Sequence, residues 1–160
     1  MMKTIRKWHG ALALALVCPV FASEIAHAQD LVSILLGSHH IGANSNFEEF
    51  NPGAFLTWEG DKMDWTVGGF RNSYGGASTA VMVARSLWEQ GVFDLSLTGG
   101  LALYPGEGRN FDVHAGDVIP LVGLHARYGN AFVQAFQSDG ATADGLLTFG
   151  LTFSLDQADP

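Results

Sequence analysis

Residues 70–76, Phe-Arg-Asn-Ser-Tyr-Gly-Gly, place a base, an amide and two hydroxyls directly after an alternating apolar run. Histidine is the side chain that can take a proton from a hydroxyl near neutral pH, and His39 and His40 stand together earlier in the chain. A histidine beside a serine activates its hydroxyl, an acceptor hydroxyl or water, which supports acyl transfer. We therefore predict that His40 and Ser73 form a catalytic pair if the fold brings them together.

The neighbours of this pair suit the same chemistry. Asn72 could orient the imidazole or donate a hydrogen bond to an oxyanion, so it joins the predicted catalytic residues. Arg71 could hold a lipid phosphate through its bidentate guanidinium fork. His39 and Tyr74 complete the predicted substrate-binding set. The alternative is that the segment is a simple turn and that both histidines are solvated loop residues.

A metal site is not predicted, and no cofactor is expected. Adjacent histidines on a strand point to opposite faces, which suits chelation poorly. The sequence has no HExxH motif and no cysteine cluster.

The N-terminus has the three-part pattern of a secretory signal. A basic start is followed by an apolar run over residues 11–22 and a small-x-small site at residues 26–28. The run is shorter than the roughly 20 residues of a permanent membrane helix. We predict cleavage before Gln29, so that residues 1–28 are a signal peptide and residues 29–160 form one β-barrel domain.

The charge of the predicted mature chain excludes some classes of function. Removing residues 1–28 leaves five bases and fifteen acids, so the formal net charge falls from −8 to −10. This balance argues against nucleic acid, since phosphate binding relies on clustered Lys and Arg. The only cysteine, Cys18, is lost with the signal, so neither a disulfide nor a thiolate is available.

After residue 29 the chain reads as apolar and polar residues in alternation, broken by Gly, Asn, Asp and Pro, which is typical of strands and turns. The run over residues 93–103 is longer than a typical globular strand and matches a tilted transmembrane strand. Eight strands are expected, at residues 31–40, 52–59, 63–72, 78–88, 93–103, 118–128, 131–137 and 147–155.

The last of these runs, residues 147–155, indicates what surrounds the sheet. One face is a continuous row of Leu and Phe, and the other holds only Thr, Ser and Gly. Small polar residues suit the lumen of a narrow barrel and the apolar row suits lipid. The predicted fold class is an all-β, eight-stranded antiparallel transmembrane β-barrel, which leaves no unpaired edge in hydrocarbon. The alternative is a soluble secreted β-sandwich.

The topology of such a barrel brings the two candidate segments to one rim. If the mature N-terminus is periplasmic, odd-numbered strands run outward. The first strand then ends at His39 and His40 and the third at residues 71–74, both on the outer side. The barrel is narrow enough for the loops after these strands to converge over its mouth.

Short motifs with this spacing resemble a known family. Residues 38–41, 51–53, 70–74, 119–121 and 128–129 together resemble the outer-membrane lipid A palmitoyltransferases, the PagP family. The resemblance implies a bacterial outer-membrane barrel, without cofactor, that moves a palmitoyl chain from a phospholipid to lipid A. A monomer is expected.

The resemblance also assigns roles to residues. The family's catalytic histidine falls on His40, and its Asp-Ser pair falls on Asn72 and Ser73, so this chain carries an amide in place of the carboxylate. Pro52 and Pro120 correspond to prolines that open the barrel wall for lateral lipid access, since proline interrupts a hydrogen-bond ladder. The amphipathic helix that precedes the barrel in well-known members has no counterpart after Gln29. We therefore expect a divergent member of this family.

The sequence is compatible with three functions. In the leading one, an acyltransferase holds the donor chain in the lumen, where Gly68, Gly100 and Gly150 are expected to leave room for it. The second is a small structural or adhesive barrel without catalysis, with a packed lumen. The third is a lipid A deacylase, although the sequence lacks the His-x-Ser motif of that class.

Overall fold

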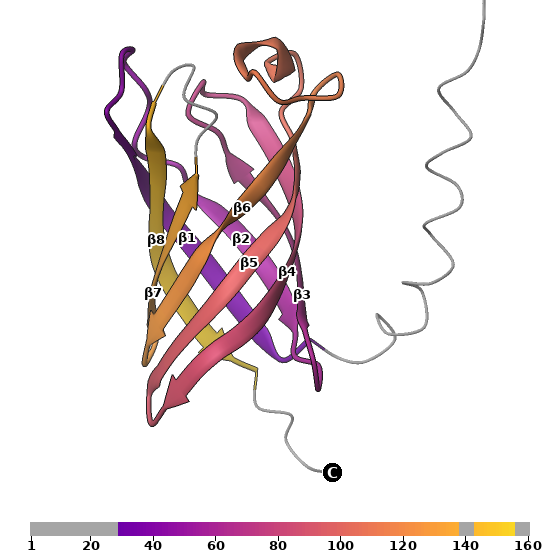
Figure 1. Cartoon of the computed structure of the whole chain (residues 1–160), viewed down its shortest axis with the longest axis vertical. Helices are drawn as coiled ribbons and strands as arrows, with labels where there is room; N and C mark the ends of the chain where they lie inside the picture. Colours follow the sequence, from indigo (N-terminus) through magenta and orange to yellow (C-terminus); the bar gives the residue numbers. More distant parts are fainter. Residues whose placement is uncertain (1–28, 138–142, 156–160) are drawn as a thin grey trace, which may run out of the picture.

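The computed structural model describes residues 29–137 and 143–155, which form a closed barrel of eight antiparallel strands (Figure 1). The strands are β1 (Leu31–Ile41), β2 (Gly53–Trp58), β3 (Asp64–Arg71), β4 (Ala77–Gln90), β5 (Phe93–Leu103), β6 (Val118–Tyr128), β7 (Ala131–Gln137) and β8 (Gly145–Ser154). Each strand pairs with the next, and β8 pairs with β1 to close the sheet. The predicted all-β, eight-stranded antiparallel barrel is confirmed. The predicted signal peptide lies outside the described residues.

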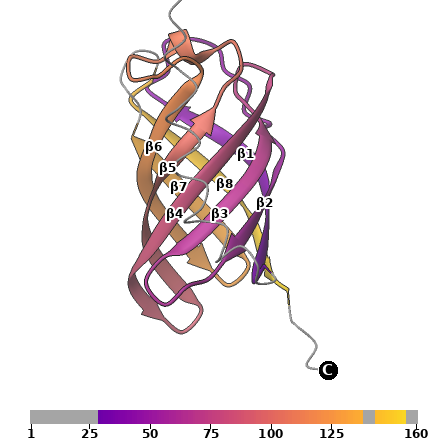
Figure 2. The same cartoon turned by 90° about the vertical axis from the view of Figure 1, so that its right-hand side faces the viewer.

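The two ends of the barrel differ (Figure 1 and Figure 2). At one end, here named the turn end, the connections are the short segments 59–63, 91–92 and 129–130. At the other, the loop end, lie segments 42–52, 72–76 and 104–117, the last of which contains a 3-10 turn, η1 (Gly108–Asn110). Within the described residues no helix is long and apolar enough to cross a membrane.

Side chains alternate between the lumen and the outer surface of the barrel as the strand period requires. On β8, Thr148 and Thr152 are buried inside, whereas Phe149 and Leu151 are exposed outside. The outward positions form an apolar band around the barrel, to which Leu36, Val67, Val81, Leu97, Leu101, Val122, Leu124, Val133, Phe149, Leu151 and Phe153 contribute.

The lumen is polar toward the turn end and apolar in its middle. Hydroxyl pairs join strands in the polar part, with Ser33 and Thr152 2.8 Å apart and Thr57 and Thr66 2.9 Å apart. An apolar cluster follows, formed by Leu35, Phe55, Ala80, Met82, Ala102, Tyr104, Ile119, Phe132 and Phe136. The middle of the barrel is therefore filled by protein side chains.

The lumen glycines serve this packing. Gly68, Gly100 and Gly150 are opposed by the side chains of Phe55, Met82 and Phe132, respectively. A Cβ on Gly68 would overlap Cδ1 of Phe55 and the carbonyl oxygen of Ala54. The expectation that these glycines leave room for an acyl chain is wrong, because protein side chains fill that room.

The replacement Gly68→Ala should therefore destabilise the barrel. The added methyl group overpacks the lumen, and we expect the free energy of unfolding to fall by about 1–3 kcal/mol in urea denaturation. Gly69→Ala is the matched control, because Gly69 faces outward and its Cβ would come no closer than 3.6 Å to the nearest atom. Equal stability of the two variants would contradict this packing.

Candidate functional site

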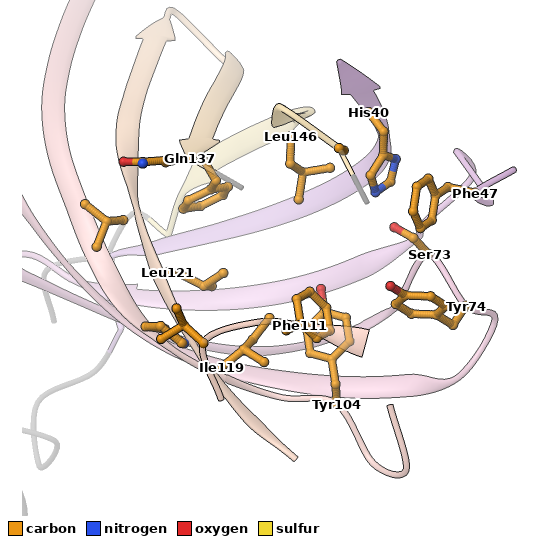
Figure 3. Close-up of a pocket in the computed structure, with 15 residues that line it drawn as sticks. His40, Phe47, Ser73, Tyr74, Tyr104, Phe111, Ile119, Leu121, Gln137 and Leu146 are labelled. Atoms are coloured by element: carbon orange, nitrogen blue, oxygen red, sulfur yellow. The ribbon is translucent and has the colours of Figure 1, made fainter. Parts of the chain in front are cut away.

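A cavity of about 240 Å³ lies at the loop end of the lumen. Its lining is mainly aromatic and aliphatic, and both His40 and Ser73 reach it (Figure 3). The remaining lining residues are Phe47, Tyr74, Tyr104, Phe111, Val113, Ile119, Pro120, Leu121, Val122, Phe136, Gln137, Ala143 and Leu146. An apolar cavity with a few convergent polar groups is the usual form of a ligand site.

The structure brings the predicted catalytic pair to one wall of this cavity. Figure 3 shows the hydroxyl of Ser73 directed toward the ring of His40. Both residues are half-buried. Nδ1 of His40 is buried without a hydrogen-bond partner among the described residues.

A β-bulge decides which histidine faces the cavity. The pairing of β1 with β8 shifts register between Leu35 and Gly37, and such a shift reverses the faces of all later residues on the strand. Ser38 is consequently buried and His40 faces the lumen. His39, predicted to bind substrate, instead points away from the cavity, with its side chain 60% exposed and its Nδ1 2.8 Å from Oε1 of Glu49.

His40 has electrostatic surroundings that keep it neutral. It stands at the loop end of β1, level with the exposed carboxylate of Glu49 and beyond the apolar band. Burial lowers the pKa of His40 below its ordinary value of 6.5, the charge of Glu49 partly opposes this, and the neighbouring His39 adds to it. A neutral imidazole is the form that accepts a proton.

Asn72 holds the turn that presents Ser73. Its side chain is 1% exposed, and its Oδ1 accepts hydrogen bonds from the backbone nitrogens of Tyr74 (3.0 Å) and Gly76 (2.9 Å). Its Nδ2 donates to Oγ of Ser78 at 2.9 Å. This is an Asx turn, in which the side chain mimics a backbone turn. The amide is thus engaged in structure, and Asn72 is a positioning residue for Ser73.

The same geometry would also accept an aspartate in place of Asn72. Both backbone donors point at one oxygen of Asn72, and aspartate would offer that oxygen equally. The hydroxyl of Ser78 can donate as well as accept, so it could serve either side chain.

The other predicted substrate-binding residues lie on either side of the rim. Arg71 is exposed outside the cavity, and its Nη2 lies 2.6 Å from Oε2 of Glu48. Tyr74 lines the cavity and packs edge-on against Phe47 and Phe111, with ring centroids 5.7 and 6.1 Å away. Tyr74 is therefore placed to contact a ligand and Arg71 to tie two loops together.

Beside Pro120 the cavity reaches the edge of β6. Strand β6 pairs with β7 only from Gly123 onward, and no described residue of β7 pairs with residues 118–122. The lining includes both the inward residues Ile119 and Leu121 and the outward residues Pro120 and Val122. At this edge the cavity is therefore bounded by residues from both faces of β6. Pro120 suits this edge because it has no N–H to leave unpaired.

The second predicted gap, at Pro52, is occupied. Strand β1 pairs with β2 only as far as Leu35, but the segment before β2 covers the rest of this edge. The backbone nitrogen of Ser38 donates to the carbonyl of Glu49 at 2.8 Å, and Oγ of Ser38 donates to Oδ1 of Asn51. Access next to Pro52 would require these bonds to break.

Sequence reasoning missed several residues that shape the site. Phe47 stacks on His40 from the loop between β1 and β2, and Tyr104 and Phe111 pack together at 5.1 Å between ring centroids. Phe47 and Phe111 lie in loops without strand periodicity, so no pattern marked them. Within the described residues no group of three or more His, Cys, Asp or Glu is placed to hold a metal ion.

Fold and site together define a closed eight-stranded barrel with an apolar cavity that is lined by a histidine and a serine and reaches the edge of β6. No protein-family model matches the chain. A search of curated proteins likewise finds no significant match.

The role of Asn72 can be tested by replacement. Asn72→Ala leaves two backbone donors and a serine hydroxyl without their partner in a buried place, which should cost about 1–3 kcal/mol of unfolding free energy. Asn72→Asp should cost less because it keeps both acceptor bonds. Asn46→Ala, in an exposed loop position, serves as the control. The assignment fails if Asn72→Ala and Asn46→Ala unfold at the same urea concentration.

Proposed function

We propose that this protein is a bacterial outer-membrane acyltransferase that moves a palmitoyl-type chain from a phospholipid to lipid A. The observation that carries the proposal is the apolar cavity beside His40 and Ser73, which reaches the edge of β6 at Pro120 and Val122. Entry at this strand edge would suit a substrate that arrives from within a lipid layer. The resemblance of the short motifs to the PagP family supports the same chemistry.

Placement in a membrane is supported by the outer surface. Large apolar side chains such as Val81, Leu101 and Val122 are each more than half exposed within the band. Exposed apolar surface of this extent marks contact with lipid or protein, and a closed barrel has no edge that hydrocarbon would leave unsatisfied. Charged pairs such as Arg71 with Glu48 stand at the loop end, outside the band. The predicted signal peptide would direct export of the chain across the inner membrane.

The chemistry assigns one step to each group. Neutral His40 takes the proton of an acceptor hydroxyl, whose oxygen attacks the ester carbonyl carbon of the phospholipid. Ser73 donates a hydrogen bond to the carbonyl oxygen as it becomes negative. The ester bond to the glycerol oxygen then breaks, and His40 returns the proton to that oxygen. The products are the acylated acceptor and a lysophospholipid.

The donor chain would enter between β6 and β7. Ile119, Leu121 and Phe136 offer it apolar contacts inside the cavity. Phe55 and Phe132 belong to the apolar cluster in the middle of the lumen, and they also line a second pocket in its polar half. Their rings would stop the chain from passing into that half. A barrel without catalysis would need neither the cavity nor the convergence of His40 and Ser73.

Both catalytic assignments can be tested by mass spectrometry of lipid A from cells that express the protein. Wild type should add the mass of one acyl chain, and His40→Ala and Ser73→Ala should each lower the product at least about a hundredfold. His114→Ala and Ser45→Ala, at exposed loop positions, are matched controls that should retain activity. A folded wild-type barrel that leaves lipid A unchanged in the presence of donor would falsify the proposal.

The pH dependence follows from the lowered pKa of His40. Below that pKa the imidazole is protonated and cannot act as a base, so the acid limb of kcat/KM should lie below pH 6.5. Glu49→Gln removes a charge that raises the pKa of His40, so the limb should move to still lower pH. The measurement is the rate of acyl transfer across pH. A limb centred above pH 6.5, or one that Glu49→Gln moves upward, would contradict the role of His40.

A further inference from the structure

Phe47 covers the catalytic pair from the loop end. Its ring stacks on the imidazole of His40, with centroids 4.1 Å apart and an angle of 17° between the planes. It also meets Tyr74 edge-on and lines the cavity. Most of segment 42–52 is exposed, whereas Phe47 turns inward and is half-buried. One face of the imidazole is thus covered by an apolar ring.

A hydrogen bond and an ion pair connect the segment that carries Phe47 to the turn that presents Ser73. Glu48, the next residue after Phe47, donates its backbone N–H to the carbonyl oxygen of Ser73 at 3.1 Å. Its carboxylate forms the ion pair with Arg71, which directly precedes the Asn72 turn. Any outward movement of Phe47 would pull on these contacts. The ring is thereby held in register with both His40 and Ser73.

Covering matters because a base that activates a lipid hydroxyl activates water equally well. Water is far more abundant at the rim than any lipid acceptor, so transfer instead of hydrolysis requires that water be excluded. Nδ1 of His40 is buried with no partner among the described residues, which indicates that bulk water does not reach it.

We propose that Phe47 is the specificity-determining residue that keeps water from His40 and Ser73 and so directs the acyl group to a lipid hydroxyl. This inference rests on the proposed acyltransferase function. With water as acceptor, the water oxygen would bond to the carbonyl carbon and the ester bond to glycerol would break. His40 would carry the proton to the leaving oxygen, and the products would be a free fatty acid and a lysophospholipid.

The experiment compares the two products of one reaction. Purified, folded protein is incubated with phosphatidylcholine labelled in its palmitoyl chain and with lipid A, and labelled lipid A and free palmitate are quantified. In Phe47→Ala the ratio of free palmitate to acylated lipid A should rise by about tenfold or more, within the range that a single pocket contact gives. Phe47→Leu, which retains part of the cover, should give a smaller rise. Phe50→Ala, at a 67% exposed phenylalanine of the same segment, should leave the ratio unchanged.

A second readout does not depend on turnover. The pKa of His40, followed by NMR, should rise toward 6.5 in Phe47→Ala, because the imidazole gains water, and should stay unchanged in Phe50→Ala.

The outcomes separate the two proposals. If wild type transfers the chain and neither Phe47 variant changes the ratio, the role of Phe47 is overturned and the acyltransferase stands. A loss of both products in equal proportion, without a rise in the pKa of His40, would show that Phe47 only shapes the site, and would overturn it as well. If folded wild type forms neither product, the acyltransferase proposal fails and the inference about Phe47 fails with it.

Discussion

The pairing of β1 with β8 is the interaction on which the rest of the structure depends. It closes the sheet, and the bulge between Leu35 and Gly37 lies within it. Because of the bulge, His40 faces the lumen and His39 faces outward. The position of His40 in the site therefore depends on a single β-bulge in the strand pairing that closes the barrel.

The loops position the remaining residues of the site. The Asn72 turn presents Ser73, and segment 42–52 brings Phe47 onto His40 and connects Glu48 to the same turn. Below them, aromatic rings paired with glycines fill the middle of the lumen, as Phe55 does against Gly68. The cavity is consequently confined to the loop end.

The strands were predictable from the sequence because period two is a direct consequence of strand geometry. The expected runs at residues 93–103, 118–128 and 131–137 coincide with β5, β6 and β7. The bulge was not predictable, since an extra residue in a ladder leaves no mark in a pattern of apolar residues. The meaning of Gly68 was misread for a related reason: a glycine in a lumen position indicates close approach but does not say whether a ligand or a phenylalanine approaches. Phe47 was missed because its contact depends on a loop.

The central claim is that a lipid chain enters the cavity beside His40 and Ser73 from the side of the barrel. The most direct measurement is photocrosslinking with a phospholipid that carries a diazirine in its acyl chain, followed by mapping of the modified residues. The account predicts label on the lumen-facing residues Ile119, Leu121 and Phe136. Label confined to outward residues such as Leu124 and Val133 would place the lipid only around the barrel and contradict the claim.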